Sequence, residues 1–104
     1  MTRTDFAVLY RWHLHPGRED SFIQAWTTIT EAFKEQRGAL GSRLHHADDG
    51  TWVAYAQWPD RGAWEASGQL GSVDPAASLA MSEAIAESFE PILMQPVCDR
   101  LVRD

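Results

Sequence analysis

The order of strand-type and helix-type segments is the feature that most constrains what this chain can fold into. Residues 5–15 alternate two rows of side chains, one wholly apolar or aromatic and the other mixed, which is the period-two pattern of a strand. After the Pro16-Gly17 pair, residues 18–37 carry bulky apolar side chains at helical spacing and end before Gly38. The chain therefore begins with a strand that is followed by an amphipathic helix.

The middle of the chain predicts a hairpin. Residues 39–47 and 51–58 have the composition of strands, and Asp49-Gly50 lies between them. Glycine at such a point accepts the positive φ of a tight turn. Asp60 follows the second strand and is a suitable N-cap for a short helix.

The last part of the chain predicts a further helix and a final strand. Asp74-Pro75 combines a capping side chain with a proline in the first turn. We expect this helix to continue toward Pro91, with its inward stripe formed by Leu79, Ser82, Ile85, Ala86 and Phe89. An extended arm then leads to a last strand over residues 97–102.

This order predicts an α+β fold of the ferredoxin-like βαββαβ type, with a four-stranded antiparallel sheet and helices on one face. The 104 residues are enough for a single domain over residues 1–104. The sheet face without helices would be exposed in a monomer, and an exposed apolar sheet face is usually an interface. We therefore expect a homodimer through the sheet faces.

Charge and composition exclude several classes of function. The chain has 15 acidic and 9 basic residues, a formal net charge of −6, which argues against a nucleic-acid partner. It contains no apolar run long enough to span a membrane. With one cysteine, Cys98, no internal disulfide can form, and the first six residues lack the apolar stretch of a signal peptide. We expect a cytoplasmic protein.

The side chains that most often carry chemistry form no recognisable constellation. His13 and His15 share one face of the first strand, whereas His45 and His46 are adjacent and point to opposite faces. No acidic or cysteine cluster completes a ligand set, so we predict no metal site. Cys98 shares a strand face with a nearby arginine but has no readable histidine partner, which favours a structural thiol. No catalytic residue can be named from these patterns.

The aromatic residues are more informative. Five tryptophans fall on the first strand, the first helix, the third strand and the following short helix, and these elements can converge between sheet and helices. There they could line a pocket for a flat apolar ligand, oriented by a tyrosine hydroxyl or an indole N–H. The alternative is that they simply fill the core.

The stretch from Phe6 to Ser67 resembles the antibiotic biosynthesis monooxygenase (ABM) domain of the dimeric α+β barrel superfamily. The segments that carry the resemblance are Phe6–Trp12 with His15–Gly17, Phe22–Trp26, Gly38–Ser42, Tyr55–Trp58 and Ala63–Ala66. The residues beyond Asp74 fit by element order only. The whole chain thus resembles one ABM-like domain.

The resemblance implies a pocket between sheet and helices in each protomer. Some members of this family are oxygenases that act on phenolic or quinol substrates without a cofactor, because the substrate itself reduces O₂ after losing a proton. The matched positions imply that Tyr10 faces the pocket, while Arg11 and His13 face the dimer. The substrate-binding residues that we expect are Tyr10, Trp12, Tyr55, Trp58 and Trp64.

Departures from the family pattern narrow the expected activity. The haem-degrading branch uses an asparagine on the first strand and a histidine after the third, whereas this chain has no asparagine and no histidine after His46. Haem degradation is therefore disfavoured. Many relatives also carry a histidine where this chain has Ser67-Gly68. The alternatives to an aromatic monooxygenase are a non-catalytic ligand-binding or interaction domain and a structural dimer with a filled core.

Overall fold

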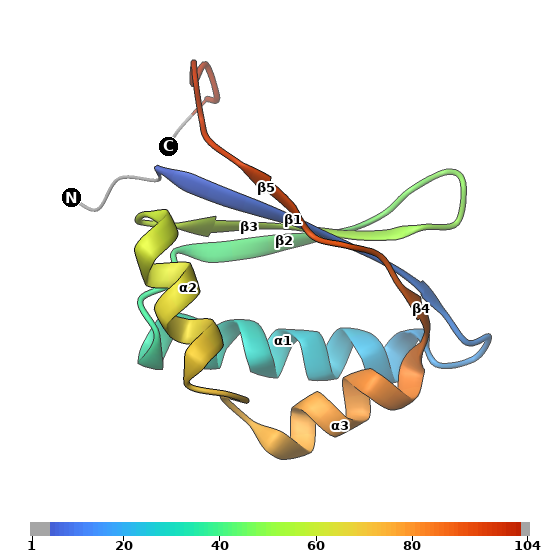
Figure 1. Cartoon of the computed structure of the whole chain (residues 1–104). Coiled ribbons are helices and arrows are strands. Elements are labelled where there is room, and N and C mark those ends of the chain that lie inside the picture. Colours follow the sequence, from blue (N-terminus) through green and yellow to red (C-terminus); the bar gives the residue numbers. More distant parts are fainter. Residues whose placement is uncertain (1–4, 103–104) are drawn as a thin grey trace.

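The computed structural model describes residues 5–102. Its helices lie on one side of an antiparallel sheet (Figure 1). In chain order the elements are β1 (Phe6–Leu14), α1 (Glu19–Gln36), β2 (Gly41–His46), β3 (Trp52–Trp58), α2 (Arg61–Gln69), α3 (Pro75–Ala84), β4 (Ile85–Ser88) and β5 (Ile92–Met94). The predicted α+β ferredoxin-like arrangement is confirmed.

β1 is the central strand of the sheet. The strand order is β2-β3-β1-β4, and β5 also pairs with β1. Tyr10 lies opposite Ala54 in β3, and Ser42 in β2 lies opposite Ala56. Because side chains alternate along a strand, this register places the even-numbered residues of β1, β2 and β3 on the face toward the helices and the odd-numbered residues on the other face.

The core lies between this even-numbered face and the helices. Phe6, Val8 and Trp58 are buried near one end of the sheet, whereas Trp12 and Phe22 are buried near the other. Phe22 belongs to the apolar stripe predicted for α1, and its side chain is fully enclosed. α1 also contacts α3, which lies farther from the sheet and leads directly into β4 (Figure 1).

Two predicted helix starts are confirmed at the level of atoms. The Oδ1 of Asp60 accepts a hydrogen bond of 2.8 Å from the Ala63 N–H, and the Oδ1 of Asp74 accepts one of 3.1 Å from the Ala77 N–H. Each carboxylate satisfies a backbone donor that the first helical turn would leave unpaired. α2 and α3 are thus held as two separate helices.

The predictions for the C-terminal part are wrong in four respects. α3 ends at Ala84 instead of continuing toward Pro91, and residues 97–102 form no strand. Leu79, predicted to face inward, is 63% exposed. The sheet has five strands instead of four, because two short strands, β4 and β5, share one edge of β1.

Tertiary pairing explains these differences. The free edge of β1 needs backbone partners, and residues 85–88 and 92–94 provide them in place of another helical turn. Pro91 lies between the two short strands, where its missing N–H costs no ladder hydrogen bond. Because β4 and β5 occupy this edge, residues 97–102 find no free edge of β1 to pair with.

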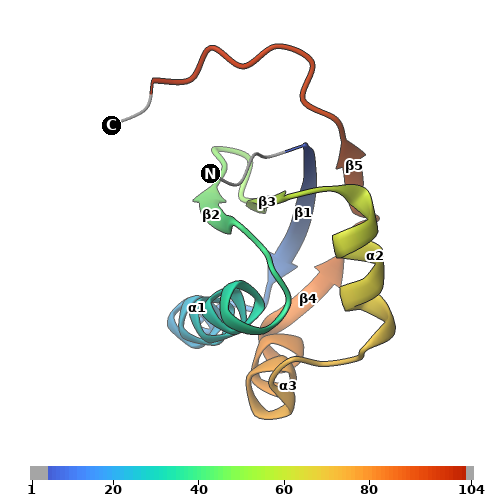
Figure 2. The same cartoon turned by 90° about the vertical axis from the view of Figure 1, so that its left-hand side faces the viewer.

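The face of the sheet without helices is crossed by a C-terminal arm. Residues 95–102 leave β5 and extend over the side opposite the helices (Figure 2). Hollows lie between the arm and the sheet, and Tyr55 and Leu101 border both of them. Among residues 5–102, no helix has the length and apolar character needed to cross a membrane.

Candidate functional site

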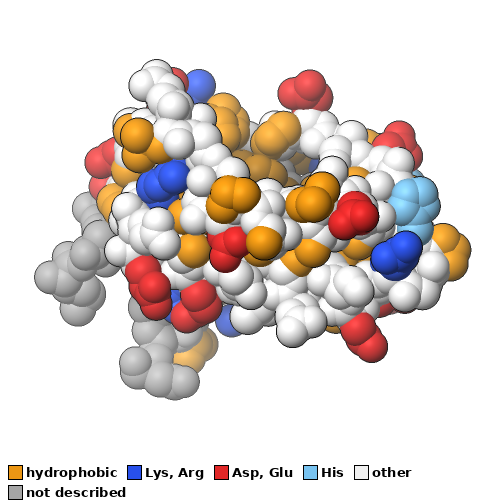
Figure 3. Space-filling model, turned by 90° about the horizontal axis from the view of Figure 1, so that it is seen from below, with side chains coloured by type: hydrophobic (Ala, Val, Ile, Leu, Met, Phe, Trp, Pro, Cys, Tyr) orange, Lys and Arg blue, Asp and Glu red, His pale blue; other side chains and the backbone are white. Residues whose placement is uncertain are grey.

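A small apolar cavity lies between the sheet and the helices. Its volume is about 220 Å³, and β1 and β3 form one wall while α1 forms another. Seen from the helix side, hydrophobic side chains are visible within a hollow of the surface (Figure 3). The lining residues are Tyr10, Trp12, Trp26, Ile29, Thr30, Phe33, Ala39, Gly41, Ser42, Ala56, Trp58 and Met81.

A second hollow adjoins the cavity on the side of α2. Tyr10, Phe33 and Trp58 border both spaces, and Trp64 borders only the second. The remainder of its wall comes from Glu65 and from the residues around the end of α2, namely Ser67, Gly68, Gln69 and Gly71. The three shared aromatic side chains thus separate one apolar space from a more polar one.

Tyr10 is the central polar group of this region. Its hydroxyl oxygen accepts a hydrogen bond of 2.9 Å from the indole Nε1–H of Trp64. Its ring is parallel to that of Trp12 within 8°, at a centroid distance of 6.0 Å. Burial raises the pKa of the Tyr10 phenol above its ordinary value, and the bond from Trp64 opposes this in part. The phenol therefore keeps its proton at neutral pH.

The tryptophans both pack and line the cavity. Trp12 meets the edge of Phe22 at a centroid distance of 5.1 Å, and Trp58 meets Phe33 at 5.9 Å. These contacts hold the two indoles in place from α1 while their remaining surface faces the cavity. The two readings of the sequence, core filling and cavity lining, therefore apply to the same side chains.

The structure brings together four of the five residues predicted for substrate binding. Tyr10, Trp12 and Trp58 line the cavity, and Trp64 contacts Tyr10 from the adjoining hollow. Tyr55 is separated from them, because its odd position in β3 places it on the opposite face of the sheet. The alternation of β3 carries this information, since Ala54, Ala56 and Trp58 form its buried row.

Nine of the described lining residues lie outside the set predicted for substrate binding, and two of these nine are aromatic. Trp26 and Phe33 belong to the apolar stripe of α1 and line the cavity from the helix side. Their helical spacing is the signal that places them toward the sheet. Spacing alone does not separate a residue that fills the core from one that borders an open space.

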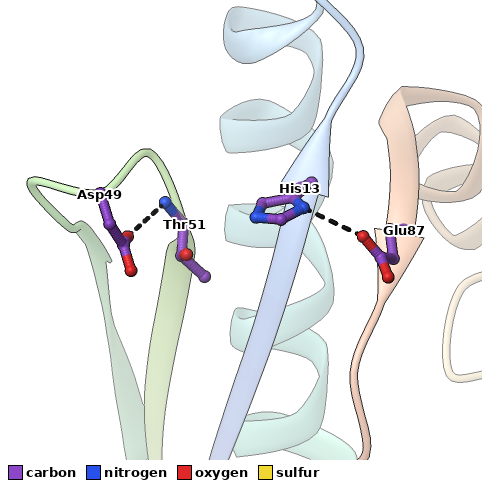
Figure 4. A network of polar contacts seen from close by, with 4 residues as sticks. All are labelled: His13, Asp49, Thr51 and Glu87. Atoms are coloured by element: carbon purple, nitrogen blue, oxygen red, sulfur yellow. Dashed lines mark hydrogen bonds and ion pairs between the residues drawn. The ribbon is translucent and has the colours of Figure 1, made fainter.

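The histidine expected to face away from the pocket lies on the open face. His13 Nδ1 is 3.1 Å from Glu87 Oε1 on β4, and both side chains are about half exposed (Figure 4). Nearby, the Asp49 carboxylate accepts a hydrogen bond from the Thr51 N–H, which lowers the pKa of Asp49. These groups lie outside the cavity. Within residues 5–102, no three histidine, cysteine, aspartate or glutamate side chains gather as a metal site would require.

Arg37 connects the helices beside the second hollow. One of its guanidinium nitrogens donates to the Ser67 carbonyl at 2.8 Å and to the Gly71 carbonyl at 3.3 Å. From the sequence, Arg37 is only the last residue of the helix predicted over residues 18–37. Its contacts instead join the end of α1 to the end of α2, the helix that carries Trp64.

Cys98 is exposed in the C-terminal arm and not within a strand, contrary to prediction. It does not border the aromatic cavity. A thiol in that position has no contact with Tyr10 or with the tryptophans that surround it.

Several solved structures share this fold. SnoaB from Streptomyces nogalater, a cofactor-independent oxygenase, is 18% identical with a TM-score of 0.73, over 94% of this chain and 98% of that chain. Rv0793 from Mycobacterium tuberculosis is 13% identical with a TM-score of 0.73, over 94% and 100%. PA3566 from Pseudomonas aeruginosa is 15% identical with a TM-score of 0.69, over 94% and 99%. At these identities the likeness shows the fold.

Comparison with models of protein families identifies the family of this chain. No curated protein matches the chain. The family model described as antibiotic biosynthesis monooxygenase matches residues 5–75, which include β1, α1, β2, β3 and α2. This stretch supplies three of the five strands and the aromatic residues that line the cavity. The chain belongs to the antibiotic biosynthesis monooxygenase family.

Proposed function

We propose that this protein is a cofactor-independent monooxygenase that acts on a small phenolic or quinol molecule bound between the sheet and the helices. The observation that carries the proposal is the apolar cavity in which Tyr10, Trp12 and Trp58 meet. Membership of the family supports the reaction class, and SnoaB supports it as a protein of the same fold. The proposed binding residues are these three and Trp64.

The proposed reaction draws all its electrons from the substrate. The substrate first loses a proton, and its anion transfers an electron to O₂. Recombination forms a carbon–oxygen bond, and loss of water from the resulting hydroperoxide leaves a carbonyl. A ring CH₂ group and O₂ thus become a ring C=O group and H₂O, with one oxygen atom in each product. The protein has to hold the ring, exclude bulk water and donate a hydrogen bond to the developing oxyanion.

The described residues can perform these tasks. Trp12, Trp58 and Phe33 provide apolar surface for an aromatic ring, and Tyr10 provides a hydroxyl beside it. None of the described residues that line the cavity has a basic side chain. We therefore propose that the proton passes to water, so that the acidity of the substrate sets the pH at which the reaction begins.

The proposed active form is a homodimer through the open sheet faces. In support, the open face carries the half-buried side chains of Leu9, Val53 and Tyr55. In the arm above this face, the side chain of Val97 is 96% exposed and that of Leu101 is 64% exposed. A second copy would bury these apolar groups. Sedimentation velocity at micromolar concentration tests this, and a monomer alone would contradict it.

Oxygen consumption tests the proposed reaction. The protein is added to a panel of quinols and hydroxy-aromatic compounds, and O₂ uptake is compared with uptake in buffer and with heat-denatured protein. We expect uptake above both controls with equal amounts of O₂ and substrate consumed. With oxygen-18 gas, one labelled atom should appear in the product and one in water. Uptake no faster than autoxidation across the panel would contradict the proposal.

One observation favours a second candidate, a non-catalytic domain that binds a small aromatic molecule. The cavity has aromatic walls but no basic side chain among its described lining residues. This candidate predicts saturable binding without O₂ consumption. Calorimetric titration beside the oxygen measurement separates the two functions.

A further inference from the structure

The hydrogen bond between Tyr10 and Trp64 has a fixed direction. An indole N–H can only donate, so the Tyr10 hydroxyl oxygen is the acceptor of the 2.9 Å bond. The hydroxyl proton of Tyr10 takes no part in it. Among residues 5–102, no acceptor receives a hydrogen bond from this hydroxyl. A tyrosine in such surroundings normally finds a partner for its O–H group, and here an occupant of the cavity can provide it.

The other polar groups of the cavity narrow the chemistry of that occupant. The Ser42 hydroxyl donates to the Tyr55 carbonyl at 2.9 Å, so its proton is already used. Thr30, on α1, is the remaining described lining residue with a hydroxyl. None of the described lining residues carries a formal charge. A charged ligand group would lose its hydration here without gaining an ionic partner, whereas an uncharged oxygen acceptor would gain a donor.

We propose that Tyr10 donates a hydrogen bond to a ring carbonyl oxygen of an uncharged aromatic ligand, and that Trp64 is a positioning residue for this donor. The inference rests on the proposed function for the location of the site, but not on turnover. Trp64 acts by occupying the lone pair of the Tyr10 oxygen on the side of α2. The O–H bond is then directed away from α2.

The cavity volume limits the size of the ring system. An engineered cavity of about 150 Å³ in another protein binds benzene. The cavity beside Tyr10 has about 220 Å³, which suits a ligand of one or two rings. A larger ligand would extend past Tyr10 and Phe33 into the adjoining hollow.

Two ligands of nearly equal shape test the donor. 1-Tetralone has a ring carbonyl, and tetralin lacks it. Calorimetry gives the dissociation constant of each for the wild-type chain, Tyr10→Phe, Trp64→Phe and the double variant. We expect the wild-type chain to prefer 1-tetralone by about three- to tenfold, the usual net effect of one neutral hydrogen bond. The ratio of the two dissociation constants is compared because damage to the packing would weaken the binding of both ligands together.

The variants have distinct expected results. Tyr10→Phe should remove the preference, and Trp64→Phe should reduce it to an intermediate value. The double variant should match Tyr10→Phe, because Trp64 acts through Tyr10. Tyr55→Phe and Trp52→Phe make the same chemical changes outside the cavity and should keep the wild-type ratio. Thermal unfolding of each variant verifies that it is folded.

Other outcomes would overturn the inference. A preference that survives in Tyr10→Phe would show that Tyr10 is not the donor, and an unchanged ratio in Trp64→Phe would remove the positioning role. No preference in the wild-type chain, or no binding of 1-tetralone, would refute the proposal as a whole. Oxygen uptake with the quinol panel is measured separately. Its absence together with a tyrosine-dependent preference would reject only the oxygenase, and its presence without that preference would reject only this inference.

Discussion

The two faces of the sheet differ in what they offer a partner, although the same strands form both. Toward the helices, Tyr10, Trp12 and Trp58 surround an apolar cavity that no charged residue within 5–102 lines. On the other face, Arg11 and His13 lie among half-buried apolar groups, and His13 contacts Glu87. Neighbouring residues of β1 therefore belong to different surfaces, one that borders the cavity and one on the side opposite the helices.

This division has a physical origin in the strand period of two. Tyr10 and Arg11 are adjacent in sequence, yet one side chain contacts Trp64 and the other lies near Phe89 on the opposite side. A substitution at one position changes one surface and leaves the other nearly intact. The two proposed properties, ligand binding and dimer formation, can thus be disturbed one at a time.

The largest expected effect is on the helix-covered face. Trp58 is 3% exposed, and replacement by alanine removes an indole from the core beside the cavity. We expect Trp58→Ala to lower the free energy of unfolding by about 3–5 kcal/mol, as for other buried aromatic residues. Urea unfolding at equilibrium measures it. A loss below about 1 kcal/mol would mean that this face is not the core.

A charge on the open face should act mainly on assembly. In Tyr55→Asp, a carboxylate would be buried without a partner where the two sheets meet in the proposed dimer. We expect the dimer dissociation constant to rise about thirtyfold or more, the effect of a central interface residue. Sedimentation equilibrium measures it, with Tyr55→Phe as the matched control. Equal dimer affinity in Tyr55→Asp would place the interface elsewhere.

Arg37 allows the helix side to be tested without changing a cavity residue. Alanine at this position removes the donor to the Ser67 and Gly71 carbonyls. We expect Arg37→Ala to cost about 1–2 kcal/mol, reduced by partial exposure from the usual value for a charged donor. Chemical denaturation measures the loss. Lys34→Ala, which breaks an exposed contact with Glu31, should change stability by less than about 0.5 kcal/mol.

The smallest effect concerns pH. Burial raises the pKa of Tyr10 above 10.0, so the folded chain holds this proton more tightly than the unfolded chain does. The resulting stability is present below pH 10.0 and is lost as the pH rises through the pKa of the folded state. Tyr10→Phe should therefore lose less stability than the wild-type chain between about pH 9 and 11. Parallel denaturation curves measure this difference.

The affinity for 1-tetralone should depend on whether the Tyr10 hydroxyl is protonated. Because Tyr10 remains protonated, affinity should be constant around neutral pH and fall only above pH 10.0. Calorimetry across this range measures it. A decrease near neutral pH would indicate that a different group controls binding.

The sequence alone predicts the local features that separate the two faces of the sheet. The alternation in residues 6–14 predicts two faces for β1, and the spacing of Phe22 and Trp26 predicts the inward side of α1. Asp60 and Asp74 predict helix starts because capping depends on nearby residues alone. The family resemblance over residues 6–67 also depends on such local patterns, and it predicts the fold.

Features that depend on distant partners could not be predicted. Ile85 and Phe89 have helical spacing, but the unpaired edge of β1 draws their segment into a strand and the following turn. The bond between Tyr10 and Trp64 joins residues 54 positions apart. Tyr55 was grouped with the binding residues by its chemistry, whereas its odd position in β3 places it on the other face.

The five indole N–H groups provide the most direct test of where a ligand binds. Nitrogen-15 NMR spectra are recorded while 1-tetralone is added, with resonances assigned by single Trp→Phe variants. The indole signals of Trp12, Trp26, Trp58 and Trp64 border the cavity or contact Tyr10 and should shift with one common dissociation constant. Trp52, outside the cavity, should move least. Unshifted spectra, or a largest shift at Trp52, would contradict a ligand site between the sheet and the helices.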